Sequence, residues 1–231
     1  LRTKQLEISN QELKDIQNEL IQADMAKSEF LSIASHELRT PLTTLLGYSE
    51  LLLTRTLTES QKNEFLDFIN EESIRLSNIV DDILDISRIE SQRDVEFNKK
   101  PLQLAELLRK IIRFYSEAGT GHSIIADIKQ DIPLVNADSE KIEQVIKNFL
   151  DNAIKYSTGG DIICKAFERD NMAWISIQDH GMGIPRQDLP YIFDKFYRVK
   201  RKDRSHIGGT GLGLSIVKFI VESHGGKIDL E

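Results

Sequence analysis

Residues 35–42 place a histidine, a carboxylate and a hydroxyl in one short stretch, Ser-His-Glu-Leu-Arg-Thr-Pro-Leu. An α-helix repeats about every 3.6 residues, so His36 and Thr40 would share one face, with Glu37 beside them. Pro41 has no N–H to give to the carbonyl of Glu37, so a bend in the helix is expected there. The pattern predicts an exposed, reactive imidazole with an acid–base neighbour; an ordinary surface histidine is the alternative.

A polar helix face is expected far downstream, in residues 148–156. Asn148, Asn152 and Lys155 fall on one side of this helix, at spacings of four and three. Amide oxygens suit Mg²⁺, which keeps most of its water and takes further ligands from phosphates. Lys155 can neutralise phosphate charge, and Tyr156 offers a ring that can stack on a base. A solvated helix face is the alternative for any one of these residues.

The next cluster, Asp-His-Gly-Met-Gly-Ile at residues 179–184, follows a predicted strand. The carboxylate of Asp179 can accept a hydrogen bond from the exocyclic amine of adenine. Gly181 and Gly183 let the backbone approach a ligand closely. Taken alone, this stretch could also be a simple turn.

Two more clusters complete a candidate nucleotide site. The aromatic residues of 192–198 could anchor a mobile lid while Arg198 faces a triphosphate; the basic residues that follow, 200–204, could equally be a solvated loop. Residues 208–214, Gly-Gly-Thr-Gly-Leu-Gly-Leu, run into a predicted helix, whose N-terminus would offer N–H groups to phosphate oxygens. This loop is not a P-loop, because no Lys-Ser/Thr pair follows, and it is not a dinucleotide fingerprint either.

The histidine octet requires a long helix to position it. Residues 1–30 contain no Gly or Pro and repeat in sevens, which predicts a two-stranded coiled coil; one amphipathic helix packed on its own domain is the alternative. The two apolar rows of the repeat are Leu6, Leu13 and Leu20, and Ile16, Ala23 and Phe30.

A helical hairpin is expected to follow from this long helix. The helix should run to about residue 53, and after a turn at 54–58 a second amphipathic helix should start, with Thr58 as its N-cap. One core position of that helix holds Glu72, against the apolar pattern. Each helix has a single apolar stripe, so two hairpins would pair into a dimeric four-helix bundle.

The remaining residues predict a second domain. Residues 91–101 are polar and end in a proline, so the domain boundary is expected there. Beyond it, the helices expected at 102–118, 139–156 and 211–224 alternate with strands expected at 123–129, 161–168 and 172–178. This mixed order predicts an α/β sandwich with helices layered on one sheet.

Composition excludes several classes of protein. A net charge of −7 argues against nucleic-acid binding, which needs a basic face. Cys164 is the only cysteine, so there is no disulfide framework and no thiolate metal site, and its apolar neighbours predict a buried thiol. No apolar run approaches the length of a membrane span, which favours a cytoplasmic setting. The chain starts without Met, so we expect a fragment with a sensor domain or membrane segment upstream.

In this order, the five clusters resemble the motifs of the sensor histidine kinases of two-component signalling. The octet from Ser35 resembles the H box, and the four downstream clusters resemble the N, G1, F and G2 boxes. The second domain is similar to the Bergerat ATP-binding fold of gyrase-type topoisomerases and MutL-type repair ATPases. The resemblance implies a coiled coil (1–29), a dimerisation and phosphotransfer domain (30–92), a linker (93–101) and a catalytic ATP-binding domain (102–231).

The resemblance also implies a role for each motif residue in phosphoryl transfer. His36 would accept the γ-phosphoryl group of ATP, Glu37 would take the ring proton, and Thr40 would position water for dephosphorylating a partner. That partner would be an aspartate-bearing receiver domain of a response regulator, and the kinase would be a homodimer.

For the nucleotide, the resemblance implies ATP and Mg²⁺. The metal would be held by Asn152 with help from Asn148, and the phosphates by Lys155 and Arg198. Tyr156 would stack on adenine, and Asp179 would bind its amine. The other nucleotide-binding residues implied are Gly181, Gly183, Ile184, Phe193, Gly209, Thr210, Gly211, Leu212, Gly213 and Leu214.

Asn148 also bears on what happens to ATP. The related ATPases carry a water-activating Glu at this position, and an amide cannot act as a general base, so hydrolysis within this domain should be slow. Two departures from the family pattern are His180, where Asn is usual, and the early end at residue 231. The alternatives are a dimeric scaffold with a degenerate ATP site and a conformational ATPase; the complete N, G1 and G2 boxes and the octet favour the kinase.

Overall fold

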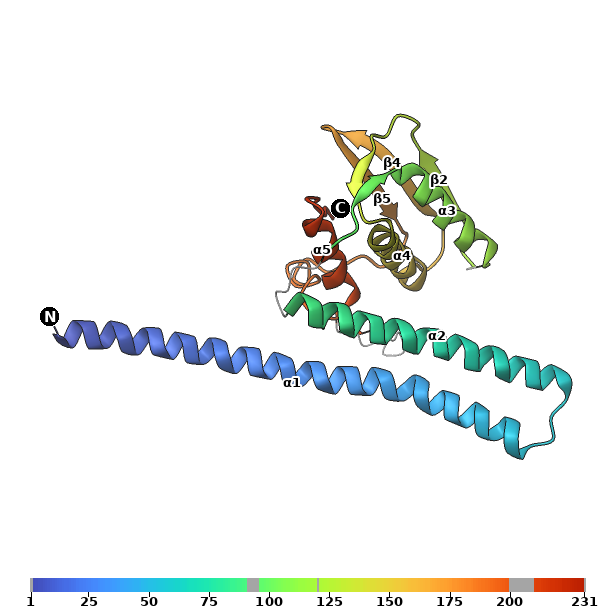
Figure 1. The fold of residues 1–231 in the computed structure, drawn as a ribbon, viewed down its shortest axis with the longest axis horizontal. Coiled ribbons are helices and arrows are strands. Elements are labelled where there is room, and N and C mark those ends of the chain that lie inside the picture. Colours follow the sequence, from blue (N-terminus) through green and yellow to red (C-terminus); the bar gives the residue numbers. More distant parts are fainter. Residues whose placement is uncertain (1, 91–95, 120, 200–209, 231) are drawn as a thin grey trace. The chain divides into compact units, whose positions relative to one another are not determined.

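The computed structural model describes residues 2–90, 96–119, 121–199 and 210–230 (Figure 1). The chain divides into two compact units, Leu1–Ile83 and Leu84–Glu231. We describe each unit by itself. Among the helices in the described ranges, none is long and apolar enough to cross a membrane.

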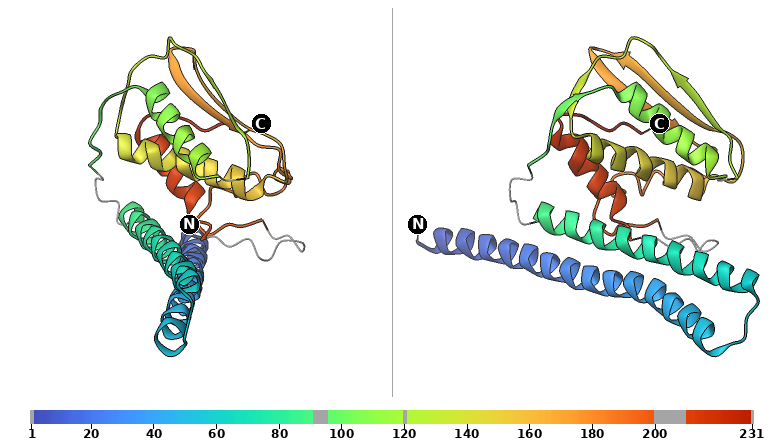
Figure 2. Two further views of the ribbon diagram at one scale, coloured as in Figure 1. Left: turned by 90° about the vertical axis from the view of Figure 1, so that its right-hand side faces the viewer. Right: turned by 45° about the vertical axis from the view of Figure 1, so that its right-hand side comes forward.

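The first unit is the predicted helical hairpin. Helix α1 (Arg2–Thr54) is unbroken through Pro41, and α2 (Glu59–Glu90) follows after a short turn. The ribbon of α1 bends only gently, in its second half (Figures 1 and 2). The ring of Tyr48 on α1 stacks against Phe68 of α2 at 5.0 Å and tilts against Phe65 at 5.1 Å. These contacts hold the two helices together near the turn.

The turn between the helices ends in a reciprocal cap. The backbone N–H of Thr58 donates to Gln61 Oε1 (3.0 Å), and the N–H of Gln61 donates to Thr58 Oγ1 (3.3 Å). This is the capping-box arrangement of a Thr followed by a Gln three residues later. It satisfies two backbone donors and starts α2 at the predicted position.

Both helices of the hairpin keep apolar side chains at the surface. On α1 these include Leu13, Ile16 and Leu20 of the predicted heptad rows, each more than half exposed. The side chains of Leu6, Ala23 and Phe30 lie outside the described residues. Further exposed apolar residues of the hairpin are Leu42, Leu46, Leu51, Leu66, Phe68, Ile74 and Val80. One hairpin therefore leaves an apolar stripe uncovered on each helix.

The second unit is the predicted α/β sandwich. Strands β2 (Ile124–Ile128), β4 (Ile162–Arg169) and β5 (Met172–Gln178) form one sheet, with β2 parallel and β5 antiparallel to the central β4. Helices α3 (Leu104–Glu117) and α4 (Ser139–Tyr156) lie on one face of this sheet, and α5 (Gly213–Ser223) packs on α4 (Figure 2). All six elements lie within one or two residues of their predicted bounds.

Two short strands were not predicted. Strands β1 (Lys100–Leu102) and β3 (Val135–Ala137) pair antiparallel in a small separate sheet. The first two residues of β1 fall in the stretch that was interpreted as linker. A proline is tolerated here because this sheet has only two strands, so each is an edge.

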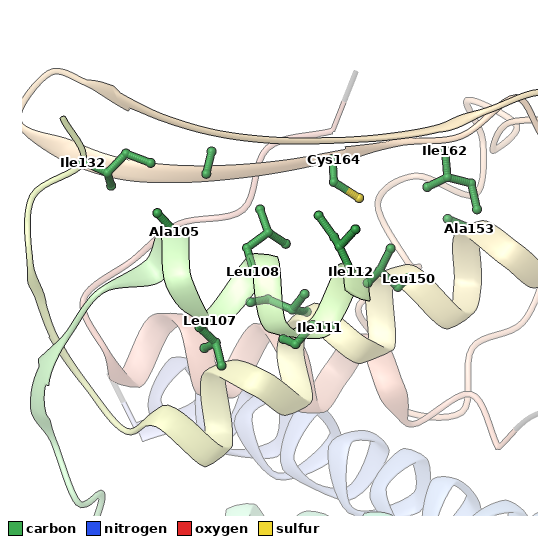
Figure 3. Packing of buried hydrophobic residues seen from close by; sticks show 12 residues of the cluster. Ala105, Leu107, Leu108, Ile111, Ile112, Ile132, Leu150, Ala153, Ile162 and Cys164 are labelled. Atoms are coloured by element: carbon green, nitrogen blue, oxygen red, sulfur yellow. The ribbon is translucent and has the colours of Figure 1, made fainter. Parts of the chain in front are cut away.

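The core of the second unit lies between the sheet and the helices. Leu108 and Ile111 of α3 meet Leu150 of α4 and the inward side chains of β4, and all are almost fully buried (Figure 3). Cys164 points from the sheet toward Ile112 (Figure 3), as expected of a small buried apolar residue. Burial raises the pKa of its thiol to about 11, so the thiol is unreactive at neutral pH.

Candidate functional site

The imidazole of His36 is exposed while the carboxylate beside it is buried. The side chain of His36 is 76% exposed, and that of Glu37 is 12% exposed. His36 Nδ1 lies 3.9 Å from Glu37 Oε1, too far for a hydrogen bond but close enough to form one after a small rotation. Nε2, on the opposite side of the ring, is therefore the nitrogen that can meet a second reactant.

An arginine of α2 holds the other oxygen of this carboxylate. Arg75 Nη2 lies 3.9 Å from Glu37 Oε2, and Arg75 Nη1 lies 3.6 Å from Glu72 Oε1. Glu72 is the acidic residue at an apolar position of the α2 pattern, and its Oε2 is buried without a hydrogen-bond partner among the residues that the structure describes. Sequence reasoning noted the irregular position of Glu72 but missed Arg75, because one sequence does not tell which residues of two helices face each other.

Thr40 lies one turn after His36. Its hydroxyl donates to the carbonyl oxygen of His36 (3.2 Å), and the side chain is exposed. Pro41, directly after it, is almost fully buried. The hydroxyl and the imidazole are thus on the same helix face, as predicted from their spacing.

Helix α4 carries the polar face that was predicted from residues 148–156. It begins at an Asp138 cap, whose Oδ1 accepts from the N–H groups of Glu140 (3.1 Å) and Lys141 (3.3 Å). Farther along, Asn152 Nδ2 donates to Asn148 Oδ1 (3.3 Å), so the two amides form one unit.

At its C-terminal end, α4 presents a cation and an aromatic ring. Lys155 Nζ lies 5.2 Å from the centroid of the Tyr156 ring, within the range of a cation–π contact. Tyr156 is 39% exposed, so it remains accessible to a ligand.

The Asp179 cluster lies against the C-terminal end of α4. Ser157 forms an isolated antiparallel bridge with Gly181, and the N–H of Gly181 donates to Asp179 Oδ1 (2.6 Å). A Cβ at Gly181 would come within 2.7 Å of the carbonyl oxygen of Tyr156, so only glycine permits this approach. Gly183 has a φ of +61°, a left-handed conformation that favours glycine.

The aromatic cluster contacts the glycine loop. The N–H of Phe196 donates to the carbonyl oxygen of Gly211 (2.9 Å), and Phe196 itself has a φ of +66°. The Tyr197 hydroxyl donates to Asp188 Oδ1 (2.5 Å), and this bond raises the pKa of Tyr197 to about 12. Phe193 is half-buried. The sequence singled out Phe193 and Arg198 but missed the main-chain contact of Phe196.

The glycine loop meets the middle of α4 at the point where α5 begins. The N–H of Leu212 donates to Thr210 Oγ1 (3.2 Å), and α5 begins at Gly213. A Cβ at Gly213 would overlap with the side-chain amide of Asn148. Leu212 is buried, and Leu214 is half-buried. Gly209 lies outside the described residues.

The four downstream clusters therefore converge on the C-terminal half of α4 and the N-terminal end of α5. The N box touches the G2 box through Asn148 and Gly213, and the G1 box through Tyr156 and Gly181. Exposed Ile184 and Arg198 extend from the G1 and F clusters. The sequence-based prediction that these clusters belong together agrees with this geometry.

His180, which departs from the family pattern, has a structural role. Its Nδ1 lies 2.9 Å from the carbonyl oxygen of Asp161, and its own carbonyl accepts from the Thr158 hydroxyl (3.2 Å). Its ring also packs on Gly160. His180 thus ties the loop after α4 to the Asp179 strand end.

The donor set of this region fits a magnesium ion that is shared with phosphates. Within the described ranges, no group of three His, Cys, Asp or Glu side chains could hold a metal by itself. The adjacent amides of Asn148 and Asn152 offer two oxygens, which suits a Mg²⁺ that completes its shell with water and phosphate oxygens.

Comparisons with known proteins identify the families of the helical hairpin and of the α/β domain. Residues 137–231 match the family of histidine kinase-, DNA gyrase B- and HSP90-like ATPases, and residues 26–92 match the His Kinase A (phospho-acceptor) domain. Sensor histidine kinase WalK of Bacillus subtilis is 36% identical over 210 residues, which cover 89% of this chain and 34% of that protein. Sensor protein kinase WalK of Staphylococcus aureus is 36% identical over 211 residues, 90% of this chain and 51% of that protein.

Solved structures give the same result. Histidine kinase AdeS of Acinetobacter baumannii has a TM-score of 0.59 at 26% identity, and the match covers 81% of this chain and 86% of the AdeS chain. Full-length ShkA in complex with AMPPNP has a TM-score of 0.60 at 26% identity, and the match covers 86% of this chain and 41% of the ShkA chain. The chain spans between a third and about half of the length of the WalK relatives. On these matches and this geometry, the chain belongs to the sensor histidine kinases of two-component signalling.

Proposed function

We propose that this chain transfers the γ-phosphoryl group of ATP to His36 and then to an aspartate of a response-regulator receiver domain. The observation that carries the proposal is an exposed imidazole beside a buried carboxylate, in a chain that also holds the ATPase-family domain. The nucleotide complex of the relative ShkA supports a nucleotide as the ligand of that domain.

The environment of His36 assigns a task to each ring nitrogen. Nδ1 lies on the side of Glu37, so this carboxylate takes the ring proton, while Nε2 attacks the γ-phosphorus. A bond forms between Nε2 and phosphorus, the bond from phosphorus to the bridging oxygen breaks, and ADP leaves with that oxygen. The carboxylate is ready for this role because Arg75 holds its second oxygen.

The converging clusters of the second unit supply the phosphoryl donor. Lys155 and Arg198 offset the charge of the phosphates, and the N-terminus of α5 offers N–H groups to them. Tyr156 stacks on adenine, and Asp179 accepts from its amine. Bound Mg²⁺ would neutralise further phosphate charge, and the residues that would hold it are Asn152 and Asn148.

Asn148 explains why the acceptor lies elsewhere in the chain. A carboxylate at this place could activate water, but an amide has no basic lone pair for a proton at neutral pH. Without a base to activate water, hydrolysis of ATP in the nucleotide domain is slow, and His36 serves as the phosphoryl acceptor.

We also propose that the helix face that carries His36 and Thr40 removes the phosphoryl group from the response regulator. The hydroxyl of Thr40, one turn from His36, positions water for hydrolysis of the phosphorylated regulator. This phosphatase activity requires the hydroxyl and does not require the imidazole as nucleophile.

We propose a homodimer in which the exposed apolar stripes of two hairpins cover each other. The division into segments 1–29, 30–92, 93–101 and 102–231 belongs to this proposal. We place this part of the protein in the cytosol, where ATP and response regulators are found.

Incubation of the chain with ATP and Mg²⁺ tests the proposal. Phosphate should appear on His36 in an acid-labile, alkali-stable form, which distinguishes phosphohistidine from a hydroxyl ester. The variant His36→Gln should bind nucleotide normally and incorporate no label. Equal labelling of this variant would refute His36 as acceptor, and no labelling of the unaltered chain would favour the scaffold with an inactive site.

A further inference from the structure

Three segments of the second unit meet at the imidazole of His224, the C-cap residue of α5. His224 Nε2 lies 3.1 Å from the backbone nitrogen of Asp138, the N-cap of α4. His224 Nδ1 lies 2.7 Å from the carbonyl oxygen of Ile220, one turn back on α5. The ring of Phe97 meets the imidazole edge to face at 4.8 Å.

The two hydrogen bonds determine the tautomer of this imidazole. A carbonyl can only accept, so Nδ1 must carry the proton that it donates to Ile220. A backbone N–H can only donate, so Nε2 must be unprotonated to accept from Asp138. Only the neutral ring with its proton on Nδ1 makes both bonds.

The surroundings of the imidazole reinforce the same connection. The Asp138 carboxylate accepts from the N–H of Asn98 through Oδ2 (2.9 Å), in addition to capping α4. Lys99 Nζ donates to the carbonyl oxygen of Ser223 (2.7 Å). Four contacts thus tie residues 97–99, the start of α4 and the end of α5 together, and we call this cluster the joint.

The joint lies at the opposite end of α5 from the glycine loop. Helix α5 starts at Gly213, against Asn148 near the middle of α4, and ends at the joint beside the first residue of α4. Eleven residues of α-helix span about 16 Å. Because α5 is a rigid rod fixed on α4 at both ends, the contact at the joint sets the direction in which its N-terminus points.

We propose that His224 is a positioning residue for the nucleotide site: its bond to the Asp138 N–H aligns α5 so that the glycine loop faces the phosphates. This inference rests on the proposed function, because it assumes that the glycine loop binds phosphates. His224 does not touch the nucleotide and acts through α5. Residues 97–99 enter the same joint, so a displacement of this segment is transmitted to the loop.

The tautomer of His224 gives a direct spectroscopic test. In the unaltered chain, two-bond ¹H–¹⁵N correlation spectra should assign the proton of His224 to Nδ1, the less common tautomer of free histidine. Protonation on Nε2, or an equal mixture of tautomers, would show that His224 does not make these two hydrogen bonds and would refute the proposal. This measurement needs neither nucleotide nor a variant that folds.

The binding test uses two substitutions of His224. His224→Phe keeps a ring beside Phe97 but loses both hydrogen bonds, and it should weaken AMPPNP binding in titration calorimetry about tenfold, or about 1.4 kcal/mol. His224→Gln can still accept from the Asp138 N–H and should recover most of this loss. His122→Phe, the same change in the turn before β2, is the matched control and should leave binding unchanged.

The outcomes separate this inference from the proposed function. If the unaltered chain binds no AMPPNP, the proposed function fails, while the tautomer still tests the joint. If it binds, and folded His224→Phe binds equally well, the positioning role is wrong. If Gln restores nothing although the protein is folded, the hydrogen bond to Asp138 is not the cause of the effect.

Discussion

The contact between Gly213 and Asn148 predicts that Gly213→Ala will weaken nucleotide binding with little effect on folding. The added methyl group would overlap with the Asn148 amide, which is the far end of a side chain. Without nucleotide, Asn148 can rotate away and relieve the overlap. With nucleotide, Asn148 must return to the site, so the cost falls on the bound state.

The expected size follows from the cost of overpacking. Inserting a methylene-sized group into a packed contact costs about 1–3 kcal/mol. Since about 1.4 kcal/mol corresponds to a tenfold change in affinity, the Kd for AMPPNP should rise about 5- to 150-fold. The melting temperature of the chain should change by only a few degrees.

Titration calorimetry with AMPPNP and Mg²⁺ measures this effect, and Gly47→Ala is the matched control. Gly47 is also helical, but among the described residues no atom outside its own helix backbone and chain neighbours lies within 4 Å of a Cβ built there. Alanine should therefore stabilise α1 by up to about 1 kcal/mol and leave the Kd unchanged.

A double variant shows whether the effect passes through Asn148. If the overlap is the cause, Gly213→Ala should add nothing to the loss already produced by Asn148→Ala, because the clashing amide is gone. Additive losses in the double variant, or an unchanged Kd in Gly213→Ala, would refute the reasoning.

Three further predictions concern separate parts of the chain. Arg75→Gln should slow labelling of His36 about three- to tenfold at saturating ATP, with an unchanged Kd for AMPPNP, because Glu37 loses the group that holds its second oxygen; Arg75→Lys should recover part of the rate, and a changed Kd would contradict this role. Thr40→Ala should slow dephosphorylation of a regulator at least tenfold while labelling of His36 stays within about twofold; equal loss of both would show that Thr40 only supports the helix. Cys164 should resist alkylation at about pH 8 in the folded chain and react when urea is added, because burial raises its pKa to about 11 and keeps the thiol protonated. The free energy of unfolding should fall as the pH rises from about 9 to 11, because the unfolded chain loses the thiol proton at a lower pH than the folded chain. Rapid alkylation of the native chain would contradict the burial of Cys164.

Sequence periodicity was sufficient for most elements of the fold. Helix α4 has the predicted bounds, because its apolar positions recur at helical spacing and Asp138 marks its start. Strands β4 and β5 were recognised from runs of Ile and from partial alternation. Strands β1 and β3 were missed because three residues are too few to establish a period, and a proline in β1 argued against a strand.

The candidate site was predictable where function depends on local motifs, and not where it depends on packing. Asn148, Asp179 and the glycine loop belong to short recognisable stretches. Arg75 and His224 act through residues that are distant in sequence, and nothing local distinguishes them from ordinary surface residues. Their roles emerge only from the packing of α2 beside α1 and of α5 beside α4.

The left-handed backbone of Phe196 stores strain in the aromatic segment of residues 192–198. A bulky residue at a φ of +66° costs of order 1–3 kcal/mol, and here it is maintained by the bond to Gly211. The carbonyl that accepts this bond belongs to the glycine loop, so breaking the bond would release the strain at Phe196. The backbone conformations of the aromatic segment and of the glycine loop are therefore energetically coupled.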